Sequence, residues 1–176
     1  MTAGAPLAEV AVVARPRAAR GILFALGLAV RCALGRSGVS AWKREGDGAT
    51  PIGAFHPIAL LYRADRLPRP RTRLPVTAID PGAGWCDDPD DRAYNRPVRL
   101  PYPASHEHLW RKDSLYDLVV VLDYNLAPTI PGRGSAIFLH LAGADLAPTA
   151  GCIAVSPIAM RRLLPRLAPS TVITVR

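Results

Sequence analysis

Proline and glycine set the strongest limit on how this chain can fold. The sequence of 176 residues contains 18 prolines and 14 glycines, spread along its whole length. Both residues interrupt regular elements and are typical of turns. We therefore predict a mainly β protein of short strands joined by tight turns, with residues 1–176 forming a single domain around one core. Residues 1–20 are either part of this domain or a flexible N-terminal segment.

Apolar and β-branched runs mark the expected strands. Residues 116–125 (YDLVVVLDYN) give the strongest such pattern, and residues 74–80 and 171–175 give shorter ones. After residue 155 the apolar period changes to that of a helix. Ser156 suits the N-cap of that helix and Pro157 its first residue. We also expect a short helix beginning near Ser105.

The segment from residue 136 to residue 155 places a histidine and a cysteine in one strand–loop–strand unit. An apolar run, residues 136–139, is followed directly by His140, and a loop with Gly143 and Pro148 leads to Cys152 and a second run, residues 153–155. A strand, a turn and a return strand bring an imidazole beside a thiol, which is the usual way to generate a thiolate nucleophile. Gly151 leaves space for a carbonyl group next to the sulfur and for an oxyanion at nearby backbone N–H groups. A buried structural cysteine is the alternative interpretation, because free cysteine is among the most buried residues.

Near the N-terminus, a basic segment (residues 15–20) precedes an apolar run (residues 21–30). This combination is typical of a secretory signal peptide, and the run is too short to span a membrane. Arg31 ends the run and no clear cleavage site follows it. We favour a β-hairpin that turns near Gly27 over an export signal.

Two blocks of this sequence resemble the L,D-transpeptidase (YkuD-type) catalytic domain. The block T-A-G-C-I (residues 149–153) with the preceding His140 is similar to that family's active-site motif, and K-R-E-G-D-G-A-T-P-I-G-A-F (residues 43–55) is similar to its upstream motif. The resemblance implies a mixed β-sandwich with a short helix after the catalytic cysteine. It also implies a cysteine acyltransferase that cross-links peptidoglycan stem peptides through a thioester on Cys152, with His140 as the base and an oxyanion site near Gly151.

The chain departs from the family pattern at three positions. Leu141 replaces a glycine, Ala150 replaces a histidine, and Ala154 replaces an arginine two residues after the cysteine. We expect other side chains to contact the substrate in place of that arginine. The nearby candidates are Arg161 and Arg162 on the predicted helix, with Tyr124 and Asn125 at a strand end, and we expect at least one of the two arginines to substitute for the missing one. Thr149, which retains a hydroxyl, is a further candidate for contact with the substrate.

Composition narrows the classes of ligand. The formal charge is +8, and 20 of the 22 basic residues are arginines without a long basic run. Because no nucleic-acid-binding motif accompanies this charge, we predict no nucleic-acid ligand and favour an anionic polymer such as cell-wall peptide. The four aspartates in residues 87–91 lack the spacing of a calcium loop, so no metal site is predicted. No cofactor and no stable protein partner are expected either.

Two further functions stay open from the sequence. One is a hydrolase, an L,D-carboxypeptidase or amidase, acting on the same stem peptides. The other is a wall-binding module without catalysis. The family's function implies the periplasm or cell envelope, while the lack of a convincing signal peptide leaves a cytoplasmic location open. Three distant cysteines, Cys32, Cys86 and Cys152, give no metal or redox motif, and the pairing of the first two is undecided.

Overall fold

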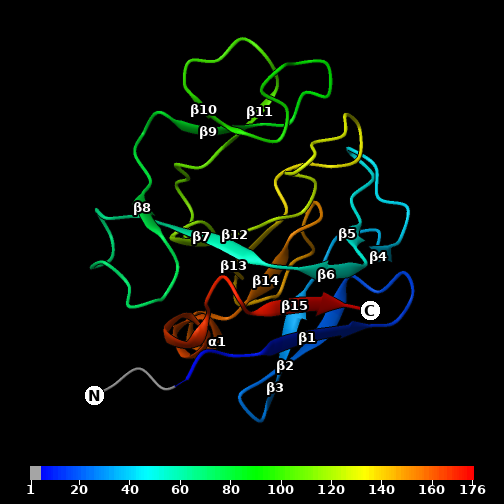
Figure 1. Ribbon diagram of the computed structural model, residues 1–176, viewed down its shortest axis with the longest axis vertical. Helices are drawn as coiled ribbons and strands as arrows, with labels where there is room; N and C mark the ends of the chain where they lie inside the picture. Colours follow the sequence, from blue (N-terminus) through cyan, green and yellow to red (C-terminus); the bar gives the residue numbers. More distant parts are fainter. Residues whose placement is uncertain (1–4) are drawn as a thin grey trace.

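The computed structural model describes residues 5–176, and strands dominate it (Figure 1). The elements follow in the order β1 (Glu9–Ala14), β2 (Arg20–Ala25), β3 (Leu28–Ala33), β4 (Val39–Ser40), β5 (Thr50–Pro51), β6 (Gly53–Phe55), β7 (Pro57–Tyr62), β8 (Val76–Ala78), β9 (Ala83–Cys86), β10 (Pro97–Arg99), β11 (His106–His108), β12 (Leu118–Leu122), β13 (Phe138–Leu141), β14 (Ile153–Val155), α1 (Pro157–Leu163), the 3₁₀ helix η1 (Leu164–Arg166) and β15 (Val172–Val175). The prediction of a mainly β fold with one short helix after Cys152 is confirmed.

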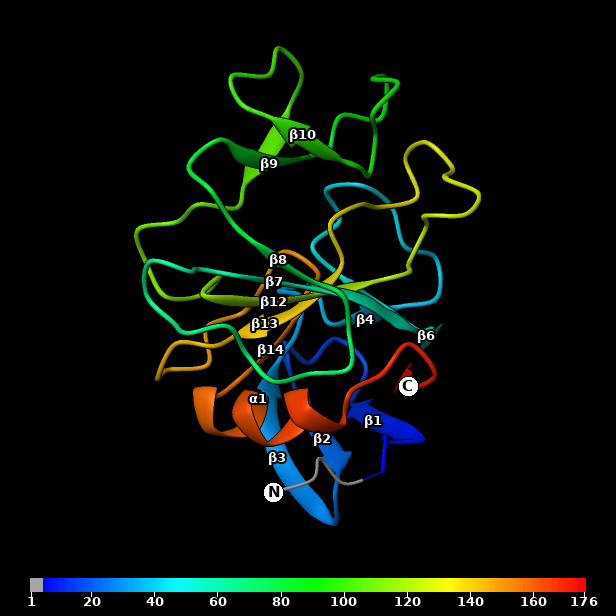
Figure 2. The same cartoon turned by 60° about the vertical axis from the view of Figure 1, so that its left-hand side comes forward.

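Ten strands form one mixed sheet, in the order β6-β15-β1-β2-β3-β14-β13-β12-β7-β8. Only His56 separates β6 from β7 in the chain, yet these strands lie near opposite ends of that order. The sheet therefore curls so that its two ends approach each other, as Figure 2 shows. Two strands, β13 and β14, run parallel at its centre, and the loop between them carries the chain from His140 to Cys152.

The N-terminal apolar run forms the expected hairpin. β2 pairs antiparallel with β3 from Arg20 to Ala33, and the turn consists of Leu26 and Gly27, both with positive φ (56° and 71°). Two such residues in sequence make the turn that best matches the twist of paired strands. β1, which lies within residues 1–20, is inserted between β15 and β2.

The central strands are buried on both faces, which explains their continuous apolar sequences. Along β12, Leu118, Val120 and Leu122 point into the main core, while Val119 and Val121 point into a second core on the opposite face. The same alternation holds for β13, where Leu139 belongs to the main core and Phe138 to the second. The second core contains Cys152, so the nucleophile candidate lies on the face away from α1.

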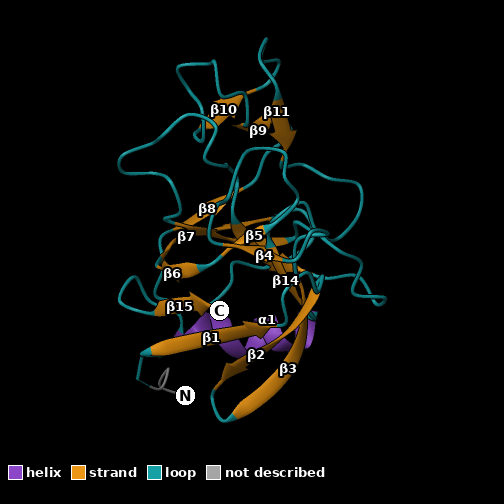
Figure 3. Ribbon diagram, turned by 90° about the vertical axis from the view of Figure 1, so that its right-hand side faces the viewer, coloured by secondary structure: helices purple, strands orange, loops and turns teal. Residues whose placement is uncertain are grey.

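The helix closes the main core at one end of the molecule (Figure 3). The Ser156 hydroxyl accepts the Ala159 N–H at 3.2 Å, and Pro157 takes the first position, as predicted. Met160 and Leu163 pack into the main core. No helix within residues 5–176 is long and apolar enough to span a membrane.

A small three-stranded sheet, β10-β9-β11, stands above the second core at the end opposite to α1 (Figure 1). We call this sheet with its loops (residues 79–117) the lobe. The prediction of a short helix near Ser105 is wrong, because His106–His108 form β11 and pair with β9. The partner strand lies about 20 residues earlier in the sequence, and local preference could not reveal that pairing.

Candidate active site

Cys152 sits immediately before β14 and faces the second core. Its side chain is only 7% exposed, and the thiol donates a hydrogen bond to the Ala136 carbonyl at 3.1 Å. The preceding Gly151 has a φ of +150°, and a Cβ at that position would lie 3.0 Å from the carbonyl oxygen of Ala49. Glycine is therefore required both by the backbone conformation and by the close approach of the upstream segment.

His140 and Cys152 share one face of neighbouring strands. In the parallel pairing of β13 with β14, His140 lies beside Ala154, and residues two apart on a strand point to the same side. The imidazole Nδ1 lies 2.8 Å from the Leu141 carbonyl oxygen. Since a carbonyl oxygen can only accept a hydrogen bond, this contact favours the tautomer with the hydrogen on Nδ1, in which Nε2 is the basic nitrogen. The Tyr116 ring packs against the imidazole at 5.0 Å between ring centres, in an edge-on arrangement.

Burial keeps both groups neutral. Burial lowers the pKa of His140 to about 4. Burial, with a smaller contribution from the negative charge of Glu107, raises the pKa of Cys152 to about 12. These shifts disfavour a standing imidazolium–thiolate pair at neutral pH.

Two threonine hydroxyls hold the backbone of the cysteine. The Thr149 hydroxyl donates to the Cys152 carbonyl at 2.7 Å and accepts the Gly151 N–H at 3.1 Å. Thr50, on β5, donates to the same carbonyl at 3.4 Å and accepts the Gly35 N–H at 2.8 Å. Thr149 therefore braces the cysteine loop, and it also lines the cavity described below.

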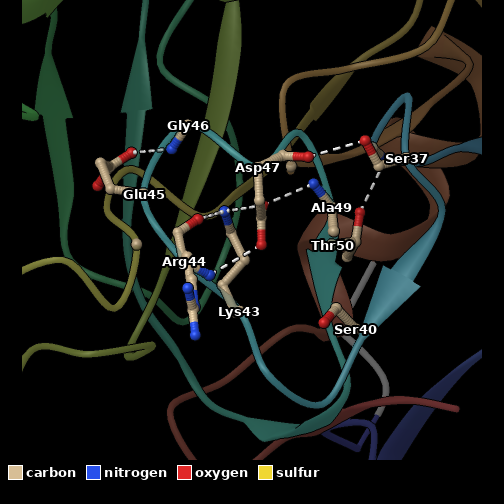
Figure 4. A network of polar contacts seen from close by, with 12 residues as sticks. Ser37, Ser40, Lys43, Arg44, Glu45, Gly46, Asp47, Ala49 and Thr50 are labelled. Atoms are coloured by element: carbon tan, nitrogen blue, oxygen red, sulfur yellow. Dashed lines mark hydrogen bonds and ion pairs between the residues drawn. The ribbon is translucent and has the colours of Figure 1, made fainter.

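The upstream block forms a compact polar network beside this loop (Figure 4). The Asp47 carboxylate accepts the Lys43 ammonium at 2.6 Å and the N–H groups of Arg44 and Ala49 at 2.8 Å each. Partial burial of Asp47 disfavours its ionisation, but the hydrogen bonds from Lys43, Ala49 and Arg44 outweigh that effect and lower its pKa. Lys43 is 5% exposed, and a Cβ on Gly151 would lie 3.6 Å from its Cε. The network thus fixes a buried cation against the cysteine loop.

A cavity of about 380 Å³ opens between the cysteine loop and the lobe. His140, Gly151 and Cys152 line it from the main sheet. The charged side chains that line it are Lys43, Glu45, Asp87, Glu107, Arg111 and Asp145. Within residues 5–176 no group of three His, Cys, Asp or Glu side chains is arranged to hold a metal ion.

Aromatic rings and Asn95 hold the lobe against β13 and the residues just before it. Trp85 of β9 packs edge-on against Phe138 at 5.2 Å between ring centres. The Asn95 side chain accepts the Trp85 indole N–H at 2.9 Å and the Ala136 N–H at 3.0 Å. Because the Ala136 carbonyl also accepts the hydrogen bond of the Cys152 thiol, the position of the lobe is coupled to that of Cys152.

The other predicted contact residues lie away from this cavity. Asn125 bonds the backbone of the loop at residues 130–134, and Tyr124 packs against Phe55 at 5.6 Å between ring centres. Arg161 lines a separate cavity beside residues 67–71, and Arg162 faces the β2–β3 hairpin. The helix lies on the opposite face of the central strands, so the structure brings neither arginine to Cys152. The arginine that reaches the cavity is Arg111, from the lobe.

Sequence reasoning missed the lobe's contribution to the site. Glu107, Arg111 and Tyr116 line the cavity, and none of them belongs to a motif. Glu107 lies in a segment that we expected to be a helix, and the sequence therefore could not predict in which direction its side chain points. Ala154, in place of the arginine, packs with Ala33 and Ala142, so small side chains fill this position.

The three cysteines are free and buried, which settles the question about Cys32 and Cys86: they do not pair.

Comparison with known families matches residues 12–175 to the L,D-transpeptidase catalytic domain (YkuD). No curated protein and no solved structure gives a significant match. The match covers both the upstream network and the histidine–cysteine unit, and nearly all of the chain. This protein therefore belongs to the L,D-transpeptidase (YkuD) catalytic domain family, a family of catalytic domains that act on peptidoglycan.

Proposed function

We propose that this protein is a cysteine acyltransferase that acts on peptidoglycan stem peptides and forms cross-links. The observation that carries the proposal is the placement of Cys152 and His140 on one face of adjacent strands at the floor of a cavity. Membership of the family supplies the substrate class.

In the first half-reaction the Cys152 sulfur attacks the carbonyl carbon of the diamino acid in a donor stem. A C–S bond forms, and the thiol proton passes to Nε2 of His140. The negative oxygen of the tetrahedral intermediate accepts N–H groups near the nucleophile. Since the Gly151 N–H already donates to Thr149, we assign this role to the N–H of Cys152.

Collapse of the intermediate breaks the C–N bond to the terminal D-residue, and His140 returns its proton to the leaving amine. The remaining acyl group is a thioester on Cys152. An amine of a second stem then attacks the thioester, gives its proton to His140, and releases the thiol with a new amide bond. Attack by water instead would release a shortened stem, which is the hydrolase alternative.

Burial shifts the pKa values of the two groups in opposite directions, raising that of Cys152 and lowering that of His140. A free thiolate would be costly in so buried a site, and a neutral imidazole is ready to accept a proton. Proton transfer is therefore expected to accompany attack rather than precede it. The substrate itself excludes the remaining water and brings the carbonyl into the cavity.

Mass spectrometry of products after incubation with purified disaccharide-tetrapeptides tests this proposal. We expect cross-linked dimers that have lost one terminal residue, and trimmed monomers alone would indicate the hydrolase. Cys152→Ala and His140→Ala should each lower turnover by several orders of magnitude while keeping the fold. Cys32→Ala, which removes a buried thiol from the main core, is the matched control. Turnover by folded Cys152→Ala would refute the assignment, and unchanged peptides with the parent protein would favour a binding module.

A further inference from the structure

The strand β11 carries two histidines on the same side of the small sheet. In a helix, residues two apart face different directions, whereas in a strand they project from the same face. His106 and His108 lie in β11, and their rings are neighbours, with centres 5.0 Å apart and planes tilted by 53°. The helix expected in this segment would have separated them. The observed strand therefore brings two imidazoles together.

This pair of histidines faces away from the cavity beneath the lobe. Glu107, which lies between them in sequence, is opposite Trp85 in the antiparallel pair of β9 with β11. Trp85 packs against Phe138 of the main sheet, so Trp85 and Glu107 face the main sheet and the two histidines face the other way. His108 is exposed and His106 is partly exposed. Dissolved ions can therefore reach both rings from the solvent.

Each histidine has a ring nitrogen that is free to bind a ligand. Nδ1 of His106 lies 2.7 Å from the Ala104 carbonyl oxygen, which can only accept a hydrogen bond. This contact favours the tautomer with the hydrogen on Nδ1, orients the ring and leaves the lone pair on Nε2. Metal-binding histidines are typically held in this way through their other nitrogen. Neither ring nitrogen of His108 has a hydrogen-bond partner in the described part of the chain.

The spacing of the rings matches that of two imidazoles bound to one metal ion. With metal–nitrogen bonds of about 2.0–2.1 Å and a tetrahedral angle between them, the centres of two ligating rings lie about 5 Å apart. The observed separation is 5.0 Å, so the two rings can share one ion without a change in the strand. Within residues 5–176 no group of three His, Cys, Asp or Glu side chains is arranged around an ion, which leaves the remaining positions to water.

The loop after β9 brings negative charge close to the histidine pair. Residues 87–92 follow β9 directly and contain four aspartates and one arginine. The Tyr102 ring packs edge-on against the His106 ring at 6.4 Å between centres, and its hydroxyl donates to the Asp91 carboxylate at 2.8 Å. One carboxylate of the loop is thus separated from His106 by a single phenol ring. Clustered negative charge raises the local concentration of cations.

We propose that His106 and His108 chelate one divalent transition-metal ion on the outer face of the lobe. Each imidazole donates one nitrogen lone pair, and water occupies the remaining positions of the ion. Imidazole ligands favour Zn²⁺, Ni²⁺ and Cu²⁺, whereas Mg²⁺ and Ca²⁺ prefer oxygen ligands. The site faces away from Cys152 and His140, so this inference does not depend on the proposed function.

Titration of the protein with Co²⁺ tests the site, because the absorption spectrum of this ion identifies its ligands. We expect saturable uptake of one Co²⁺ per chain, with d–d absorption and without the sulfur-to-metal charge-transfer band of a bound thiolate. Ni²⁺ should displace Co²⁺, and an excess of Mg²⁺ should not. A charge-transfer band would place the ion on a cysteine and overturn the proposal. Absence of saturable uptake at submillimolar Co²⁺ would overturn it as well.

Single substitutions assign the ligands. His106→Gln and His108→Gln each remove one of the two imidazoles and should weaken Co²⁺ binding by at least about 10- to 100-fold, since that loss is typical even of changes to groups that only orient a metal ligand. Because His108 is exposed, its replacement should leave the fold intact, which circular dichroism can verify.

His56→Gln is the matched control for these variants. His56 is also exposed, and its Nδ1 lies 3.1 Å from the Thr171 carbonyl oxygen, but it forms no ring pair with another histidine within residues 5–176. This variant should bind Co²⁺ with the affinity of the parent protein. If His106→Gln and His108→Gln both keep the parental affinity, or if His56→Gln loses as much affinity as they do, the assignment to the histidine pair is wrong.

Discussion

Replacing Asp47 by asparagine should destabilise the protein through Lys43. The change keeps the size of the side chain but removes the charge that faces an ammonium group of which 5% is exposed. Lys43 then retains only neutral acceptors, namely the Arg44 carbonyl at 2.6 Å and the amide oxygen of the new asparagine. Losing one partner of a fully buried ion pair costs about 3–5 kcal/mol. Because the Asp47 side chain is 25% exposed, we expect a smaller loss of about 2–3 kcal/mol in the free energy of unfolding.

This loss is measurable as a change in Tm. For a domain of this size 1 kcal/mol corresponds to about 2–4 °C, so Asp47→Asn should unfold about 4–12 °C below the parent at pH 7. The hydrogen bonds to Asp47 lower its pKa in the folded state, so its contribution is fully present above the pKa of an unfolded aspartate and is lost as the pH falls through the folded value. Thermal unfolding followed by circular dichroism should therefore show the two Tm values converging below about pH 4.

Asp80→Asn is the control for this experiment. Asp80 forms an ion pair with Arg99 at 2.5 Å, similar in length to that of Lys43, but both side chains are largely exposed. Exposed pairs contribute little because water screens them, so its Tm should stay close to that of the parent. If Asp47→Asn also keeps the parental Tm, or if its deficit persists undiminished at pH 3, the reasoning from the buried ammonium is refuted.

Four other outcomes follow from the site. Gly151→Ala places a side chain at a φ of +150° and 3.0 Å from the Ala49 oxygen; we expect a loss of about 1–3 kcal/mol in stability and loss of turnover, measured by unfolding and product analysis. Thr149→Val removes the hydroxyl that donates to the Cys152 carbonyl and should lower kcat about tenfold or more with a small change in Tm, so an unaltered kcat would contradict the bracing role. The rate of Cys152 alkylation by iodoacetamide should rise about tenfold per pH unit from pH 7 to 10, since its pKa is about 12, and a plateau near pH 7 would reveal a standing thiolate. A chain that begins after Val30 lacks β1, β2 and half of β3 and should be insoluble; normal folding would show that the hairpin is dispensable.

The sequence predicted the elements that depend on local pattern. The strand at residues 118–122, the hairpin turn at Gly27 and the Ser156 cap each rest on neighbouring residues, and the structure confirms them. The helix expected near Ser105 failed because β11 is held by β9, a contact between distant segments. Local preferences cannot reveal such pairing, and the error hid the direction in which Glu107 points.

The residues of the candidate site also differ in whether the local sequence could predict their positions. Cys152 and His140 belong to a continuous strand–loop–strand unit. Because side chains alternate between the two faces along a strand, the sequence could predict that both lie on the same face of the sheet. Arg161 and Arg162 are close to Cys152 in sequence, but the helix that carries them turns to the main core on the other side of the sheet. Arg111 is 41 residues from the cysteine (152 − 111) and reaches the cavity only because the lobe folds over it. Proximity in sequence pointed to Arg161 and Arg162, which lie away from the cavity, and distance in sequence concealed Arg111, which lines it.

The burial of the three thiols has a consequence for chemical durability. Burial raises the pKa of Cys32 to about 11 and that of Cys152 to about 12, and it also raises the pKa of Cys86. Peroxides and foreign disulfides react with exposed thiolates, and each of these sulfurs is a shielded thiol. Oxidation of Cys152 should therefore be slow, and we expect it to require either partial opening of the lobe or a bound ligand that draws the thiol proton away.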